Sequence, residues 1–258
     1  MSGGYGNLKR LVSQFFIALF AGFEIDHPVF TNAASSTFTL GPNCAKARTV
    51  NVPKGLVAAA RKRIQDQFAT VGFAKHGHGF SLFRDLNSEL AGSVILQSIN
   101  DGGDGVVHIC PWVVMTHIEL EKRIAELCEE PYHRYDVSSW STTLGYLLPV
   151  KRHTEWHFPD FAAIPATVND LFEQFMEYGW PFLESHASLE AIYELIIKRN
   201  NVGIWPYAYK VPVMLILLDR KDEARHYVEE KLVLWANERY PAADDYRHFA
   251  HRLLASLE

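Results

Sequence analysis

The densest group of residues that could do chemistry is the segment His153-Thr-Glu155-Trp-His157. Two histidines at this spacing share one face of a helix or strand, and imidazole nitrogens and carboxylate oxygens are zinc ligands. The zinc-protease motif needs a glutamate directly after its first histidine, whereas Glu155 stands midway between the two. His76 and His78, which alternate with glycines, form a second candidate pair. On residue types alone, an exposed loop or edge strand explains these histidines. A metal-dependent hydrolase that uses His153, His157, His76 and His78 stays the alternative.

Other catalytic and cofactor motifs are missing from the sequence. The chain has no Gly-x-Ser-x-Gly and no P-loop, and the glycine-rich segment 101–105 predicts a hairpin turn. Its three cysteines include no Cys-x-x-Cys pair, which argues against a disulfide framework and fits a reducing cytosol. His108 alternates with Cys110 and Trp112, which is typical of a hydrogen-bonded histidine in a core strand. We therefore expect no catalytic residues and no cofactor.

Composition indicates a folded globular chain. It has 258 residues, of which 48% are hydrophobic and 21% charged, enough to bury a core of its own. No apolar run approaches the ~20 residues that a membrane-spanning helix needs. The formal net charge is −5, and the excess acid lies in residues 160–258. This sign argues against a nucleic-acid partner and is compatible with a basic protein partner, or with a solvated helical surface.

The elements that would position these side chains follow from periodicity and turn residues. Residues 53–72 predict an amphipathic helix, and residues 80–86, 93–99 and 106–115 predict strands. A helix over 118–128, a β-like segment over 135–148 and a short strand over 153–158 follow. From Thr167 onward the pattern is helical, and Pro181 is expected to kink its helix or to end it early. The sequence thus predicts an α+β fold, with an N-terminal helix, an antiparallel meander of about four to five strands, and an all-helical C-terminal region.

Three segments are expected along the chain: an N-terminal extension (1–52), an α+β sheet domain (53–160) and a helical region packed on it (161–258). Lys9 and Arg10 precede a short apolar run, which has the form of a signal peptide. We expect a cytoplasmic protein without a membrane partner. The alternative is export with a leader over about residues 1–35, or a start assigned too far upstream.

Short patterns between Arg61 and about His117 carry a family resemblance. They are the basic helix, Gly72-Phe73-Ala74-Lys75, Gly79-Phe80, Arg84 and the strand Val94-Ile95-Leu96-Gln97-Ser98, with Leu144-Gly145-Tyr146-Leu147 further on. In these features residues 61–148 resemble a bacterial family known as domain of unknown function 4304. The resemblance implies an α+β fold without established chemistry and, by analogy, an immunity protein that silences a cognate toxin. This chain differs from that family by its long N-terminal extension (1–52) and its long C-terminal helical region (161–258).

The first functional hypothesis is therefore a non-enzymatic, protein-binding bacterial domain. It would bind a toxin that has a basic surface and would neutralise that toxin by steric occlusion. Aromatic residues outside clean helical stripes would dock the partner, because such residues are typical of interface hot spots. They are Trp156, Phe158, Trp205, Tyr207 and Tyr209. Aromatic residues are equally typical of a core, so that interpretation stays open.

Overall fold

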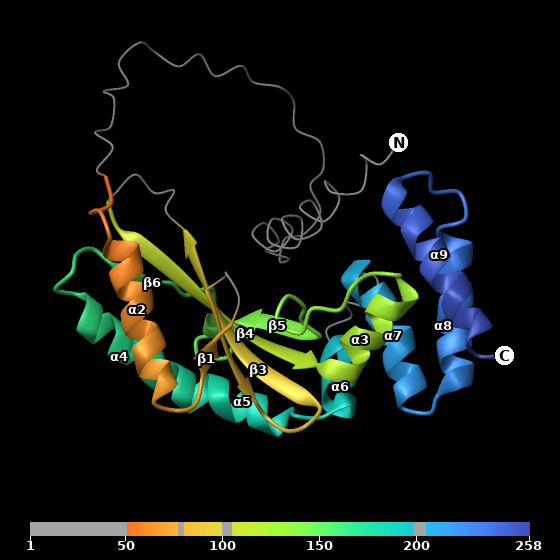
Figure 1. Ribbon diagram of the computed structural model, residues 1–258, viewed down its shortest axis with the longest axis horizontal. Coiled ribbons are helices and arrows are strands. Elements are labelled where there is room, and N and C mark those ends of the chain that lie inside the picture. Colours follow the sequence, from red (N-terminus) through yellow and green to blue (C-terminus); the bar gives the residue numbers. More distant parts are fainter. Residues whose placement is uncertain (1–50, 77–79, 100–104, 199–204) are drawn as a thin grey trace, which may run out of the picture. The chain divides into compact units, whose positions relative to one another are not determined.

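Figure 1 shows the computed structural model, which describes residues 51–76, 80–99, 105–198 and 205–258. The described elements all lie within Arg48–Glu258, which forms one compact unit. The predicted leader and His78 lie outside the described residues, as does all but the end of the predicted extension. Among the described helices, none is both long enough and apolar enough to cross a bilayer.

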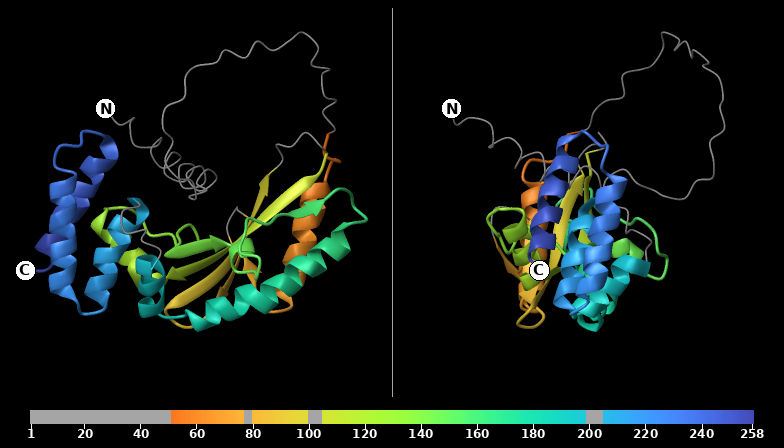
Figure 2. Two further views of the ribbon diagram at one scale, coloured as in Figure 1. Left: turned by 180° about the vertical axis from the view of Figure 1, so that it is seen from behind. Right: turned by 90° about the vertical axis from the view of Figure 1, so that its right-hand side faces the viewer.

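The described strands form one antiparallel sheet. Strands β1 to β5 are neighbours in chain order, and β6 pairs with β4 (Figure 2). They are β1 (Ala74–Lys75), β2 (Ser81–Asp85), β3 (Leu90–Ile99), β4 (Val107–His117), β5 (Trp140–Thr143) and β6 (Trp156–Phe158). Helix α2 (Leu56–Ala69) precedes the sheet and a helical region follows it. The predicted α+β class with an antiparallel meander is confirmed.

The two faces of the sheet differ in what they carry. Ile109 of β4 lies opposite Trp156 of β6, both are buried, and the Trp156 indole donates a hydrogen bond to Asp170 at 2.7 Å. This face therefore points into the core. Because successive side chains of a strand point to opposite faces, His108 and His157 lie on the other face.

Helices α2 and α4 (Ile164–Gln174) pack against each other on the core face. The buried residues of α2 recur every fourth position, as a helix needs to bury one face: Leu56, Ala60, Ile64 and Phe68. Phe68 lies 5.3 Å from Phe172 and 5.0 Å from Phe175 between ring centroids. This aromatic cluster fixes α4 over the sheet.

Ahead of Pro181 the helix changes its hydrogen-bonding pattern but continues, where a kink or an early end was expected. Helix α4 ends at Gln174, a π-helical turn covers Phe175–Gly179, and α5 (Trp180–Ser185) then carries Pro181 in its first turn. Proline lacks a backbone N–H, which costs least in the first turn of a helix. The π-turn before it shifts the backbone hydrogen bonds from a spacing of four residues to a spacing of five. Figure 2 shows α4 and α5 running along the sheet as one nearly continuous rod.

The segment 135–148 was expected to be β-like throughout, but only Trp140–Thr143 forms a strand. A 3₁₀ turn follows at Leu144–Tyr146. Gly145 is required in this turn by close packing, since a Cβ there would lie 2.3 Å from the carbonyl oxygen of Arg152 and 2.8 Å from the nitrogen of Thr154. The glycine thus lets the chain ahead of β6 cross closely over this turn.

The C-terminal region is helical, as predicted. Its helices are α6 (Leu189–Lys198), α7 (Trp205–Leu217), α8 (Lys221–Leu234) and α9 (Pro241–Ala255). Helix α3 (Ile118–Leu127), which follows β4, contacts both α7 and α9. The apolar run 211–218 is helical up to Leu217 and largely buried, with Pro212 inside the helix.

A buried polar network joins the sheet to this helical region. The Lys210 ammonium of α7 lies 3.4 Å from the Glu121 carboxylate of α3 and donates to the carbonyl of Ser138. The Ser139 hydroxyl donates to the same Glu121 carboxylate at 2.9 Å. Lys210, Glu121 and Ser139 are all buried. Charges at such depth persist only when each has partners of this kind.

His117 begins α3 and makes stability depend on pH. Its Nδ1 accepts the backbone N–H of Leu120 at 3.2 Å, which requires that nitrogen to be unprotonated. Burial lowers the pKa of His117 from its ordinary value, and four carboxylates oppose that shift. They are Glu89, Glu121, Glu119 and Glu190. The unfolded chain, whose histidines have pKa values of about 6.5, therefore binds this proton first as the pH falls.

We expect the free energy of unfolding to fall as the pH drops below about 6.5, down to the folded pKa of His117. Urea titrations at several pH values would measure this slope. His117→Asn keeps a good helix cap without a titrating ring, and it should flatten the slope. An unchanged slope in this variant would assign the acid sensitivity to other groups.

Candidate metal centre

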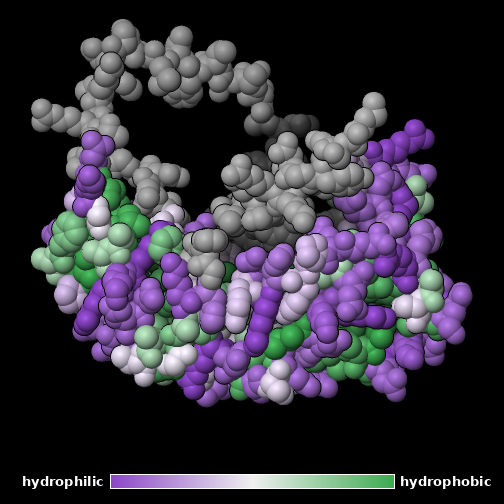
Figure 3. Space-filling model, in the orientation of Figure 1, coloured by the Kyte–Doolittle hydropathy of each residue, from purple (hydrophilic) through white to green (hydrophobic). Residues whose placement is uncertain are grey.

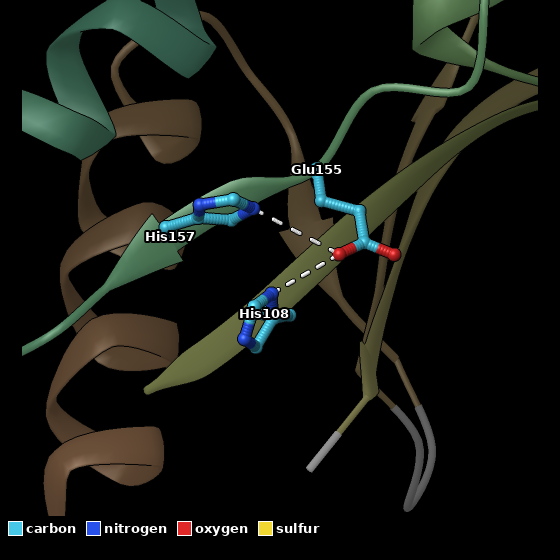
Figure 4. A group of neighbouring side chains, drawn as sticks. All are labelled: His108, Glu155 and His157. Carbon is cyan, nitrogen blue, oxygen red and sulfur yellow. Dashed lines mark hydrogen bonds and ion pairs between the residues drawn. The ribbon is translucent and has the colours of Figure 1, made fainter. Parts of the chain in front are cut away.

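His108 of β4, His157 of β6 and Glu155, which directly precedes β6, converge on the face of the sheet opposite the core. The His108 Nδ1 lies 3.1 Å from Oε2 of Glu155, and the His157 Nε2 lies 3.9 Å from the same oxygen. Figure 4 shows both rings turned toward that oxygen. The three potential ligand atoms all lie within 4.8 Å of one another. Two imidazoles and a carboxylate at such distances form a candidate metal-binding group.

Strand register brings the group together. His108 and His157 are Cα partners in the β4–β6 ladder, and Glu155 precedes His157 by two residues, on the same face. Pro111 lies where the outer partner of β4 changes from β6 to β5. A residue without an N–H is least costly at such a gap in a ladder. The interruption leaves β6 paired to only the first part of β4.

The group is partly buried and holds Glu155 as a carboxylate. The side chains of His108 and Glu155 are 18% and 22% exposed, and that of His157 is 58% exposed. The hydrogen bond from His153 is the main cause that lowers the pKa of Glu155, with His108 adding to it and burial opposing it. An ionised carboxylate is the form that a metal ion binds.

An outer layer of contacts orients Glu155. His153 Nε2 donates to Glu155 Oε1 at 2.9 Å, and because a carboxylate only accepts, that nitrogen carries the proton. The other ring nitrogen, Nδ1, lies 4.0 Å from Cys110 Sγ. Burial, and next the charge of Glu155, raise the pKa of Cys110 to about 12, so it stays a thiol. The Cys110 thiol, His153 and Glu155 thus form a chain that ends on the candidate ligand.

The distances suit a small transition metal ion. Zinc–nitrogen and zinc–oxygen bonds of about 2.0–2.2 Å in a tetrahedron place neighbouring ligand atoms roughly 3.3 Å apart. The His108–Glu155 distance of 3.1 Å already matches, and His157, at 3.9 Å, is exposed enough to turn inward. Two histidines and one carboxylate leave a fourth tetrahedral position open, which is the arrangement of catalytic zinc sites.

A cleft of about 470 Å³ adjoins the group, and Glu155 and His157 belong to both. The cleft lies between the segment 154–157 and helix α4. Its described lining contains two carboxylates, Glu155 and Asp170, and polar groups, but no lysine or arginine. The remaining lining residues are Leu148, Thr154, Trp156, Ala166, Thr167 and Gln174.

The structure brings together only part of the predicted histidine site. His153 and His157 both contact Glu155. His76 instead stacks on Tyr135, with ring centroids 4.1 Å apart, beside Phe83 of β2. It therefore does not join the group, since β3 separates β2 from β4. His108, expected to be a core histidine, is the ligand candidate that sequence reasoning missed.

The aromatic residues expected to dock a partner are largely internal. Trp156, Phe158 and Tyr207 are buried, and Tyr209 packs against Phe249 with ring centroids 4.7 Å apart. The side chain of Trp205 lies outside the described residues. In this structure the three buried rings pack into the fold, and each exposes less than a tenth of its area. The protein-binding and immunity hypothesis itself stays a prediction.

Comparisons with known proteins add no relative: no family model, no curated protein and no solved structure matches the chain. The resemblance to domain of unknown function 4304 therefore stays a prediction. Inference about function depends on the geometry of the site.

Proposed function

We propose that this protein binds a divalent transition metal ion, with zinc preferred, through His108, Glu155 and His157. In this proposal it acts as a metal-dependent hydrolase on a substrate held in the adjoining cleft. The observation that supports it is the convergence of three ligand atoms within 4.8 Å of one another, and two of the residues, Glu155 and His157, also line that cleft. The proposal replaces the expectation of a protein without a cofactor.

Each group has a defined part in this chemistry. A zinc ion with an open position lowers the pKa of water to about 7 and polarises a carbonyl group. Glu155 supplies the negative charge that holds the ion, and His153 fixes its orientation. Asp170 is the other carboxylate of the cleft, and its Oδ2 is held by the Trp156 indole at 2.7 Å.

The lining of the cleft favours a neutral substrate. Sites for phosphoryl groups use lysine, arginine or several metal ions to neutralise charge, and neither lysine nor arginine is among the residues of this lining. Thr154, Thr167 and Gln174 instead offer neutral hydrogen-bonding groups. We therefore propose carboxylic esters or amides as the substrate class.

The test measures metal binding and hydrolysis separately on the full chain without a histidine tag. After chelation and dialysis, zinc is added back and its stoichiometry is measured by mass spectrometry. Hydrolysis of p-nitrophenyl acetate and of a small panel of amides is then followed against added zinc. We expect one zinc ion per chain, and activity that rises until one equivalent has bound.

A matched control is His226→Ala, an exposed histidine on α8, which should change neither result. Failure of the chain to retain zinc would contradict the metal centre. Stoichiometric binding without hydrolysis of any ester or amide would contradict the hydrolase and leave the metal centre supported.

A further inference from the structure

A second cleft, of about 390 Å³, lies between α2 and strands β1 to β3. Three of its lining residues are basic, Arg61, Lys62 and Lys75, and none is acidic. The rest of the lining is mainly apolar: Gly55, Val57, Ala58, Gln65, Phe80, Leu82 and Leu96. Figure 3 shows hydrophobic and hydrophilic residues interspersed around α2 on the face in view. This cleft shares no residue with the candidate metal centre.

Arg61 is held rigidly in this cleft but lacks a counter-charge. Its guanidinium carbon lies 3.2 Å from the centroid of the Phe80 ring, and Nη2 donates to the Ser98 hydroxyl at 2.8 Å. Its Nε is buried and has no hydrogen-bond partner. Among the residues that the structure describes, no carboxylate forms an ion pair with Arg61, and burial lowers its pKa. A partly desolvated cation of this kind gains from a bound anion.

The surroundings add positive charge and an apolar wall. The Lys75 ammonium lies 5.4 Å from the centroid of the Phe80 ring, and Phe80 is 38% exposed. Lys62 pairs with Asp66, so its charge is already partly neutralised. From Lys54 to Lys75 the sequence has five basic residues and one acidic residue, in a chain whose net charge is −5. The positive potential is therefore local to α2 and β1.

We infer that this cleft binds a small organic anion. Its carboxylate or phosphate would lie against Arg61 and Lys75, and its apolar body against Phe80 and Leu82. The volume of about 390 Å³ is in the range of small-molecule sites, and an apolar lining with a few charged groups is typical of them. The inference is independent of the proposed hydrolase.

The experiment measures binding of 1-naphthyl phosphate, 1-naphthoate and inorganic phosphate to the full chain by calorimetry at low salt. Both naphthyl compounds are expected to bind more tightly than inorganic phosphate. Arg61→Met should weaken them about tenfold or more, since it removes a charge-assisted hydrogen bond from a partly buried site. Arg63→Met makes the same charge change at an exposed position of α2 and should leave binding within about twofold.

Thermal melting of both variants confirms that they are folded before binding is compared. Equal losses in the Arg61 and Arg63 variants would reveal non-specific attraction to a basic surface and overturn the inference. So would undetectable binding of both naphthyl compounds at about 1 mM. Inorganic phosphate binding as tightly as 1-naphthyl phosphate would overturn recognition of the apolar body. His157→Ala should bind the naphthyl compounds as the unchanged chain does, which would show that this cleft binds anions independently of the metal centre.

Discussion

Zinc affinity is expected to fall by more than about 100-fold when His157 is replaced with alanine. Loss of an outer contact to a ligand typically costs 10–100-fold, and loss of the ligand itself should cost more. The side chain of His157 is 58% exposed, so its removal creates no cavity in the core. Competition calorimetry against a chelator of known affinity measures the change.

A graded series makes this prediction specific. His153→Ala removes the hydrogen bond to Oε1 of Glu155 but no proposed ligand, so it should lower the affinity by about 10–100-fold. His226→Ala, on α8, should leave it unchanged. If all three variants bound zinc as the natural protein does, His108, Glu155 and His157 would not be its ligands. If His153→Ala had the largest effect, His153 would be a ligand itself.

The largest loss of stability is expected from Lys210→Met, at about 3–5 kcal/mol. The Lys210 ammonium lies 3.4 Å from the Glu121 carboxylate, and both residues are buried. Methionine is similar in length and apolar, so the loss arises mainly from the uncompensated charge left on Glu121. The free energy of unfolding in urea, measured at neutral pH, checks this value.

Two further variants separate this effect from ordinary packing. Adding Glu121→Gln to Lys210→Met removes the stranded charge and should recover part of the loss. Lys198→Met breaks the exposed pair with Glu194, whose side chains are 75% and 56% exposed, and should cost less than about 1 kcal/mol. A similar loss at Lys198 and Lys210 would mean that burial of the network contributes little.

Local patterns were sufficient to predict most of the fold. The predicted strand over 106–115 and the predicted helix over 118–128 match β4 and α3 closely. Their signals, alternation and a one-sided apolar stripe, depend only on neighbouring residues. The segment 135–148 was less predictable, because it buries Trp140 in a strand and Leu144 in a turn. Composition cannot distinguish those two environments.

Only part of the candidate site could be predicted from the sequence. His153, Glu155 and His157 lie within five residues, so their proximity needed no knowledge of the fold. His108 is 47 residues from Glu155 and joins them only through the pairing of β6 with β4. Strand pairing across such a separation depends on tertiary packing. The same packing places Trp156 inside, although it stands between two site residues.

The division of the ligands between β4 and β6 has a mechanical consequence. β6 has three residues and pairs only with Val107–Ile109 of β4. A metal ion held by His108 and by Glu155 and His157 would act as a reversible cross-link that closes the intervening chain into a loop. Such a link reduces the entropy of the open chain, as a disulfide does. Loss of the ion would therefore loosen β6 and its cleft first, while β2 and β3 keep their pairing.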